Sequence, residues 1–358
     1  MKITCDKSDL VQGLQIIRSA MSNRTTLPAL MNFLAETEGG KLKLISTDLE
    51  LGAKFLLPVE IDTEGAIAIP ARKFSEIIDN VDGDVAIEIK DGKVIVKSGK
   101  SRFQLIVIPK DQYPILPDFD INKAINLPTS ILADMVSKAI VAVSDDDSRR
   151  VLQGALWTAE KGTLTIVATD GRQLSVVTRE FPDASFNVIV PRKVMQEFVR
   201  LAPTGDDVFL VVTDSIIAFQ FNNTTLHSKL IEGSFPKWDQ VVPSKSDLQV
   251  TFDTKALVGI TKRASLAAMD HGSIKWKLAN GALIVTASSP NVDFEDEIPV
   301  EYTGDEFAIA FNPEFVLTCL GSFKSEKVTV GFTSNNNPIL FQPVGDKDHK
   351  YVIMPMRA

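Results

Sequence analysis

The chain has 358 residues and a formal net charge of −8 at pH 7. This length exceeds one ordinary hydrophobic core and predicts two or three domains. The negative balance argues against a protein that holds nucleic acid through overall positive charge. Cys5 and Cys319 stand outside any motif, which argues against a disulfide framework or a zinc site. No apolar run resembles a signal peptide or a membrane helix, so we expect a cytoplasmic protein with no membrane partner.

Three landmarks recur at a spacing of about 120 residues, a normal domain length. A glycine with a leucine two residues later begins an alternating β segment at Gly40, Gly162 and Gly281. A short β-like segment meets a proline at Pro70, Pro191 and Pro313. An apolar residue precedes a proline at Tyr113-Pro114, Phe235-Pro236 and Met354-Pro355. The sequence therefore predicts three repeated domains, with residues 1–122, 123–246 and 247–358 as their bounds.

Each repeat contains the same elements in the same order. Apolar residues at helical spacing predict a first helix over 8–21, 129–143 and 254–268. A second helix is predicted after each landmark proline, over 71–81, 192–201 and 313–323. Alternating segments with turns such as Asp91-Gly92 and Asn280-Gly281 predict antiparallel strands between the helices. Two helices on antiparallel sheets in every repeat indicate the α+β class.

The familiar catalytic motifs are absent from this sequence. His227, His271 and His349 share no spacing, and we expect them at the surface rather than as bases or metal ligands. The run "SDDDSRR" at 144–150 lacks the spacing of a calcium loop and is expected to be a solvated, flexible loop. "ATDG" at 168–171 is more typical of a hairpin turn than of a catalytic aspartate. We therefore expect no enzyme activity and no cofactor or metal.

Basic residues are concentrated in the predicted helices. The six segments carry ten basic and six acidic residues, a balance of +4 that leaves −12 for the rest of the chain. Exposed helix faces often collect lysine and arginine, and that ordinary interpretation stays open. The alternative is a protein whose helices face a polyanion while its sheets and loops face solvent.

A set of motifs resembles the bacterial sliding clamp family, the β subunit of the replicative DNA polymerase III, over the whole chain. The matching segments are "TLPAL" (26–30), "STDLE" (46–50), "IPARKF" (69–74), "ATDGRQL" (168–174), "VPRKV" (190–194), "SFP" (234–236), "GFTSNNNPILF" (331–341) and "YVIMPMR" (351–357). The resemblance implies a head-to-tail homodimer that closes a ring around duplex DNA. Helices of six like domains would line the hole, and polymerases, the clamp loader and other clamp-binding proteins would bind a pocket between the second and third domains.

The resemblance also implies roles for individual residues. Phosphate contacts are expected from Arg24, Arg72, Lys73, Arg149, Arg150, Arg192 and Lys193. The peptide pocket is expected from Leu152, Thr169, Gly171, Arg172, Gln173, Leu174, Pro236, Val241, Val352, Met354, Pro355, Met356 and Arg357. The dimer interface is expected to include Phe103, Leu105 and Leu266. The family often has His-Arg where this chain has Arg172-Gln173, and an arginine near Gln240.

Two rival functions remain open at this stage. One is a repeat-built module that binds peptides or small ligands without encircling DNA, and the other is a hydrolase with its site at a domain junction. The apolar tail raises a related choice, because Val352–Met356 could be the last strand of a core or the wall of a groove. The groove interpretation predicts that Met356→Ala, or loss of the last five residues, abolishes peptide binding and leaves the dimer intact.

Overall fold

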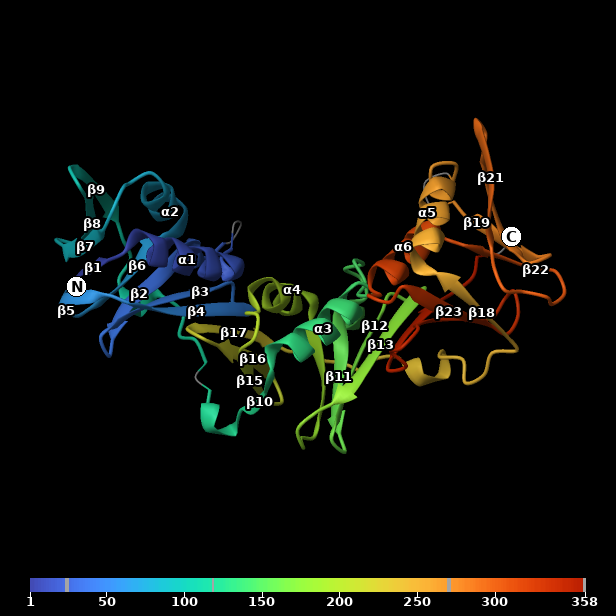
Figure 1. Cartoon of the computed structure of the whole chain (residues 1–358). Helices are drawn as coiled ribbons and strands as arrows, with labels where there is room; N and C mark the ends of the chain where they lie inside the picture. Colours follow the sequence, from blue (N-terminus) through green and yellow to red (C-terminus); the bar gives the residue numbers. More distant parts are fainter. Residues whose placement is uncertain (23–25, 118, 269–271, 357–358) are drawn as a thin grey trace. The chain divides into compact units, whose positions relative to one another are not determined.

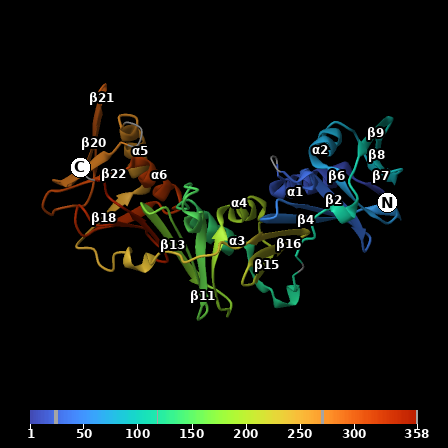
Figure 2. The same cartoon turned by 180° about the vertical axis from the view of Figure 1, so that it is seen from behind.

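The computed structural model describes residues 1–22, 26–117, 119–268 and 272–356. They form two compact units, the first made of residues 1–132 and 193–230 and the second of residues 133–192 and 231–358. Helices pack on antiparallel sheets in both units, as Figures 1 and 2 show, which confirms the α+β class. No helix within the described ranges is long and apolar enough to cross a membrane.

The first unit contains two sheets. The five-stranded sheet has the order β5 (Glu60–Thr63), β1 (Lys2–Cys5), β7 (Val85–Lys90), β8 (Lys93–Ser98) and β9 (Ser101–Ile106). The eight-stranded sheet has the order β10 (Ile125–Pro128), β15 (Asp207–Val212), β16 (Ile216–Phe221), β17 (Thr224–Lys229), β4 (Leu51–Pro58), β3 (Lys41–Thr47), β2 (Asn32–Glu38) and β6 (Ala66–Pro70). Helices α1 (Lys7–Ile17) and α2 (Ala71–Asp79) cover one face of these sheets (Figure 1).

Local sequence explains how α1 begins and how closely it packs. Asp6 precedes the helix, and its carboxylate accepts hydrogen bonds from the backbone N–H groups of Ser8 and Asp9, which caps the first turn. A Cβ atom at Gly13 would lie 2.8 Å from the side chains of Leu44 and Phe55, so glycine allows α1 to lie directly on the sheet. The buried face of α1 thereby becomes part of a continuous apolar core.

The opposite face of the same sheet is covered by a chain segment rather than a helix. Leu34 and Ile45 point to this face and pack against Tyr113, with Leu116 partly buried beside them. Ile108 pairs with Ala68 of β6 through two backbone hydrogen bonds of 3.0 Å each. The segment that leads from the first repeat to the second is thus anchored across the sheet.

The second unit also contains two sheets. The eight-stranded sheet has the order β14 (Phe186–Pro191), β11 (Gly154–Glu160), β12 (Thr163–Thr169), β13 (Gln173–Glu180), β25 (His349–Ile353), β24 (Ile339–Pro343), β23 (Lys327–Phe332) and β18 (Leu248–Asp253). The four-stranded sheet has the order β21 (Val292–Pro299), β20 (Ala282–Ser289), β19 (Ile274–Ala279) and β22 (Phe307–Phe311). The second unit also holds α5 (Thr254–Ser265), α6 (Pro313–Gly321) and most of α3 (Thr129–Ile140). Helix α4 (Arg192–Leu201) belongs to the first unit except for its first residue.

Two seams join strands of neighbouring repeats, and they are built alike. Gly52 of β4 lies opposite His227 of β17, and Leu174 of β13 lies opposite Val352 of β25. One hydrogen bond extends each seam: the Lys229 N–H donates to the Glu50 carbonyl at 2.9 Å, and the Met354 N–H donates to the Arg172 carbonyl at 2.8 Å. The middle repeat is therefore divided, since one part of its strands continues the sheet of the first repeat and the other part that of the third.

The same two strand positions recur at the outer ends of the chain's sheets. Strand β21 of the third repeat is equivalent to β4 of the first and β13 of the second, because each pairs with the strand before it, β20, β3 and β12, respectively. Strand β9 of the first repeat is likewise equivalent to β17 of the second and β25 of the third, which pair with β8, β16 and β24, respectively. Both β9 and β21 are the last strands of their sheets. Each presents one edge that has no strand beside it within the described residues.

The helices begin close to where the sequence predicts them, although several end earlier. The helix predicted over 8–21 ends at Ile17 and continues as a 3₁₀ turn over Arg18–Ala20. The surface position expected for the histidines is wrong for His227 and His349, which are both buried. His271 lies outside the described residues. The repeat boundaries at 122/123 and 246/247 stay predictions.

Candidate functional site

A cavity of about 140 Å³ opens at the seam between β13 and β25 in the second unit. Its lining is mainly apolar and consists of Leu152, Thr169, Gly171, Arg172, Gln173, Leu174, Pro236, Lys237, Trp238, Val241, Val352 and Met354. Leu174 and Val352 lie opposite each other on the two strands and belong to one apolar cluster with Val167, to which Trp238 adds its partly buried ring. Apolar walls around a small opening are typical of a site that takes side chains of a ligand.

A tight turn between β12 and β13 forms one wall of the cavity. The Thr169 hydroxyl donates to the Gln173 carbonyl at 2.6 Å and accepts the Gly171 N–H at 3.0 Å. The Asp170 carboxylate accepts the N–H groups of Arg172 and Gln173 at 2.7 and 2.9 Å. Gly171 has φ +87°, a conformation that glycine adopts without strain. The structure thus confirms that "ATDG" is a hairpin turn.

The side chain of Gln173 holds this turn against β25. Its Nε2 donates to Asp170 at 3.0 Å, and its Oε1 accepts the Tyr351 hydroxyl at 2.6 Å. Burial raises the pKa of the Tyr351 phenol well above its ordinary value, so the hydroxyl stays a donor at neutral pH. Gln173 therefore has a structural role beneath the cavity wall.

The structure brings together most of the residues predicted for the pocket, but not all. Pro355 and Met356 do not line the cavity, and the Met356 N–H instead donates to the Ala310 carbonyl of β22 at 2.8 Å. Arg357 lies outside the described residues. Lys237 and Trp238 line the cavity and were missed by the sequence analysis. The aromatic residue directly after "SFPK" was the available indication, because tryptophan is common in binding pockets.

The tail proves to be both a strand and a wall. His349–Ile353 forms β25, and Val352 is buried in the sheet. Met354 follows the strand, remains 39% exposed and lines the cavity. The two interpretations of the apolar tail are therefore compatible: the residues up to Ile353 form the strand, and Met354 after it lines the cavity.

Most of the basic residues predicted to contact phosphates are paired with acidic side chains. Arg72 and Lys73 at the start of α2 both contact Glu76, at 3.1 and 2.7 Å. Arg192 and Lys193 at the start of α4 contact Asp145 and Asp48, respectively. Arg149 contacts Asp146 at 2.9 Å. In the described part of the chain Arg150 is exposed and has no such carboxylate partner, and Arg24 lies outside that part.

The acidic run at 145–147 is exposed, as predicted, and two of its carboxylates accept hydrogen bonds from nearby residues. Its flexibility stays a prediction. Asp146 accepts hydrogen bonds from Ser148 and Arg149, and Asp147 accepts one from Gln153. These bonds hold the pKa of the Asp146 carboxyl below its ordinary value, the Ser148 hydroxyl having the largest effect. No group of three or more His, Cys, Asp or Glu side chains gathers at a metal-binding distance within the described ranges.

Two of the three residues predicted for the dimer interface are exposed, and the third, Leu105, packs partly buried against the core of the first unit. Phe103 and Leu105 belong to the edge strand β9, where Phe103 is exposed and Leu105 is half-buried. Leu266 ends α5 and is 83% exposed. One turn earlier, Arg263 contacts Asp296 of β21 at 2.6 Å, so the end of α5 lies beside the edge strand β21. Neither Phe103 nor Leu266 is an ordinary core residue of the chain.

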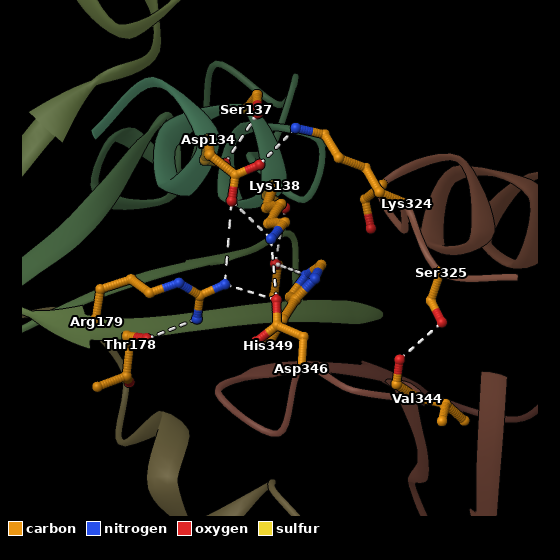
Figure 3. A network of polar contacts seen from close by, with 12 residues as sticks. Asp134, Ser137, Lys138, Thr178, Arg179, Lys324, Ser325, Val344, Asp346 and His349 are labelled. Atoms are coloured by element: carbon orange, nitrogen blue, oxygen red, sulfur yellow. Dashed lines mark hydrogen bonds and ion pairs between the residues drawn. The ribbon is translucent and has the colours of Figure 1, made fainter. Parts of the chain in front are cut away.

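A network of charges ties α3 to the loop before β25 (Figure 3). The ammonium group of Lys138 lies 2.7 Å from Asp134 and 3.0 Å from Asp346. Arg179 contacts Asp346 at 2.6 Å, and Lys324 contacts Asp134 at 2.8 Å. Burial by itself would raise the pKa of both aspartates, but the hydrogen bonds from these cations outweigh it and lower the pKa of each.

His349 lies directly beside this network, at the start of β25. Its ring is fully buried, stands edge-on to Phe323 at 4.9 Å and reaches the Ser175 hydroxyl at 3.5 Å. Burial, and then the positive charge of Lys138, lower its pKa to about 4. The imidazole is therefore neutral near pH 7, where it packs as an aromatic ring rather than acting as a surface base.

Comparison with known proteins shows similarity over the whole chain. Models of the N-terminal, central and C-terminal domains of the DNA polymerase III beta subunit match residues 1–117, 126–237 and 239–357. The Beta sliding clamp of Pseudomonas putida is 33% identical over 366 residues and that of Bacillus subtilis 28% over 377 residues, each with 100% of both chains covered.

Solved structures give the same result. A sliding clamp of Pseudomonas aeruginosa bound to griselimycin has a TM-score of 0.95 and 31% identity, with 100% of both chains covered. The sliding clamp of Bacillus subtilis has a TM-score of 0.97 and 27% identity, with 100% of this chain and 99% of that chain covered.

Proposed function

Because the chain belongs to the family of DNA polymerase III beta subunits, the sliding clamps, we propose that it acts as a processivity ring. In this proposal two chains join head to tail around duplex DNA. The cavity at the seam of β13 and β25 binds extended peptides of the replicative polymerase, the clamp loader and other clamp-binding proteins. The role requires no catalytic group and no cofactor, and it places the protein in the cytoplasm with the chromosome.

The observation that carries the proposal is the pair of equivalent seams. At the first seam β4 of the first repeat pairs with β17 of the second. At the second seam β13 of the second repeat pairs with β25 of the third. The strands left over in these two positions are β21 of the third repeat and β9 of the first. Unpaired edges of this kind readily pair with another chain. A third seam, between β21 of one chain and β9 of another, would follow the rule that the chain already uses twice.

The equivalence also predicts the register of this third seam. Asp293 occupies the same position in its repeat as Gly52 and Leu174 do in theirs. Each of the three pairs with the equivalent residue of the strand before it, which is Ser288, Thr47 and Thr169, respectively. Phe294 would then lie opposite the partner's Phe103, and Glu295 opposite the partner's Arg102. An aromatic pair beside an ion pair stabilises such an edge contact. Two such seams close a ring of six repeats.

The charges on the helices suit transient contact with phosphates. The ion pairs of Arg72 and Lys73 with Glu76 are exposed and contribute little to stability, so a phosphate can replace the carboxylate at small cost. Arg150 needs no such exchange. Contacts of this kind are independent of DNA sequence and weaken with salt, which allows a ring to slide.

The topology of the DNA tests this function. The protein is loaded onto nicked circular plasmid by a clamp loader, separated from free protein, and the plasmid is then cut once with a restriction enzyme. A ring should stay on the circle and leave the linear molecule by sliding off its ends. Equal retention on both forms would contradict encirclement and favour a binding module that does not enclose DNA.

The two methionines of the tail give a matched test of the pocket. Met354→Ala removes a side chain from the cavity wall and should weaken binding of a labelled peptide ending in Leu-Phe by roughly tenfold. Met356→Ala should leave the affinity unchanged, because Met356 does not line the cavity. Fluorescence anisotropy measures both dissociation constants. The pocket assignment fails if the two variants lose affinity equally or if neither does.

A further inference from the structure

The turn between β12 and β13, which forms one wall of the cavity, has a contact outside the cavity as well. Nη1 of Arg149 donates to the Asp170 carbonyl at 2.8 Å. The same nitrogen would lie 3.1 Å from a Cβ atom placed on Gly171, so the guanidinium group lies against the backbone of a residue that lines the cavity. Arg149 does not line the cavity itself. It therefore supports the wall without facing the ligand.

A second contact fixes the guanidinium group of Arg149 in this place. Its Nε donates to the Asp146 carboxylate at 2.9 Å, and Asp146 also accepts the backbone N–H and the hydroxyl of Ser148 at 3.0 and 2.7 Å. A guanidinium group can make directed bonds at several nitrogens at once, because it is planar and carries five N–H donors. Arg149 thus connects the acidic run at 145–147 to the turn.

The chain that carries Arg149 continues into the cavity lining. The Leu152 N–H donates to the Arg149 carbonyl at 2.9 Å, and the Ser144 N–H donates to the Leu152 carbonyl at 2.9 Å. Leu152 is buried and lines the cavity. The backbone of Arg149 is therefore fixed relative to one lining residue, and its side chain is fixed relative to another, Gly171.

The equivalent turn of the first unit is also bound by a basic side chain. There Asp48 accepts the N–H of Leu51 at 2.7 Å, as Asp170 accepts that of Gln173 at 2.9 Å. Lys193 contacts the Asp48 carboxylate. In the second unit the Gln173 side chain donates to the carboxylate, and the cation bonds to the backbone carbonyl instead. A cation thus fixes this turn in both units.

The neighbouring Arg150 has none of these contacts. It is exposed and lacks a carboxylate partner among the described residues. A phosphate can bind Arg150 directly, whereas a phosphate at Arg149 must compete with its bonds to Asp146 and to the Asp170 carbonyl. Bonds made by a charged group are stronger than those between neutral groups and cost more to break. The two adjacent arginines are therefore suited to different roles.

We propose that Arg149 is a positioning residue of the peptide pocket and that Arg150 supplies the phosphate contact of this loop. Arg149 acts through the Asp170 carbonyl: it holds the peptide unit between Asp170 and Gly171, and with it the wall on which a ligand side chain packs. A wall that is already ordered loses less conformational freedom on binding, which raises affinity. The inference rests on the proposed function of the cavity as a peptide pocket.

Arg149→Met and Arg150→Met form a matched pair, because they remove the same charged group from adjacent residues. The probe is a labelled peptide that ends in Leu-Phe and has no charged side chains, and fluorescence anisotropy measures its dissociation constant. Arg149→Met should weaken peptide binding by roughly tenfold, since a charge-assisted hydrogen bond that orders the wall is lost. Arg150→Met should leave peptide binding unchanged. Binding of a labelled DNA duplex at low salt should show the reverse, with a loss in Arg150→Met only.

Amidation of the peptide's C-terminus distinguishes positioning from direct contact. The loss in Arg149→Met should be the same with and without the terminal carboxylate. A loss confined to the free acid would mean that Arg149 pairs with the ligand, and it overturns the positioning role. Equal peptide affinity of wild type and Arg149→Met overturns the inference while the pocket stands. Absence of peptide binding to wild type is a different result, because it refutes the proposed function of the cavity and this inference with it.

Discussion

Leu266→Lys is expected to yield a folded monomer. Leu266 is exposed at the end of α5, so a lysine costs the isolated chain little. In the proposed dimer the side chain is buried beside β21, where the loss is about 2 kcal/mol at each of two interfaces and weakens association by roughly 1000-fold. Sedimentation or light scattering at micromolar concentration measures the mass. A variant that stays dimeric removes Leu266 from the interface.

Val344→Lys is the matched control for this prediction. Val344 is another exposed apolar residue of the second unit, but it follows β24 of the eight-stranded sheet, whereas β21 belongs to the four-stranded sheet, so its substitution should leave the dimer intact. A mixture of Leu266→Lys with Phe103→Glu chains tests the head-to-tail arrangement directly. Each mixed pair then has one wild-type interface and one in which the introduced lysine meets the introduced glutamate, so dimers should reappear in the mixture although neither variant forms them alone.

Lys138→Met is expected to destabilise the second unit by about 3 kcal/mol, because it leaves two partly buried carboxylates without their shared cation. The side chain of Lys138 is 9% exposed and contacts both Asp134 and Asp346. Calorimetry should show Tm lower by roughly 6–12 °C. Hydrogen exchange should quicken in β25, which follows Asp346 directly. Unchanged melting would show that Arg179 and Lys324 suffice for the network.

Lys324→Met is the control, since Lys324 contacts the same Asp134 but its side chain is 82% exposed. Its loss should cost less than about 1 kcal/mol. The pKa values of Asp134 and Asp346 are lowered in the folded protein, so the network stabilises at neutral pH and that contribution is lost as the pH falls through the lowered values. The difference between the two lysine variants should therefore shrink in acid.

Local patterns were sufficient for much of the fold. Helix spacing and the landmark prolines predicted where the helices begin, because these features act within a few residues of the chain. The Thr-Asp-Gly turn followed in the same way from hydrogen bonds between near neighbours. The pocket residues came instead from the resemblance to a family, and the structure gathers most of them around one cavity.

The repeat and its period of about 120 residues were thus determined by the sequence alone, since identical local patterns recur along it. Only the tertiary structure decided which strands of the repeats pair, because edge pairing depends on packing between segments far apart in the chain. It divided the middle repeat between two units, separated Met354 from Met356, and buried His227 and His349 beside partners far away in the chain. It also paired Arg192 with Asp145, a contact that no local pattern specifies.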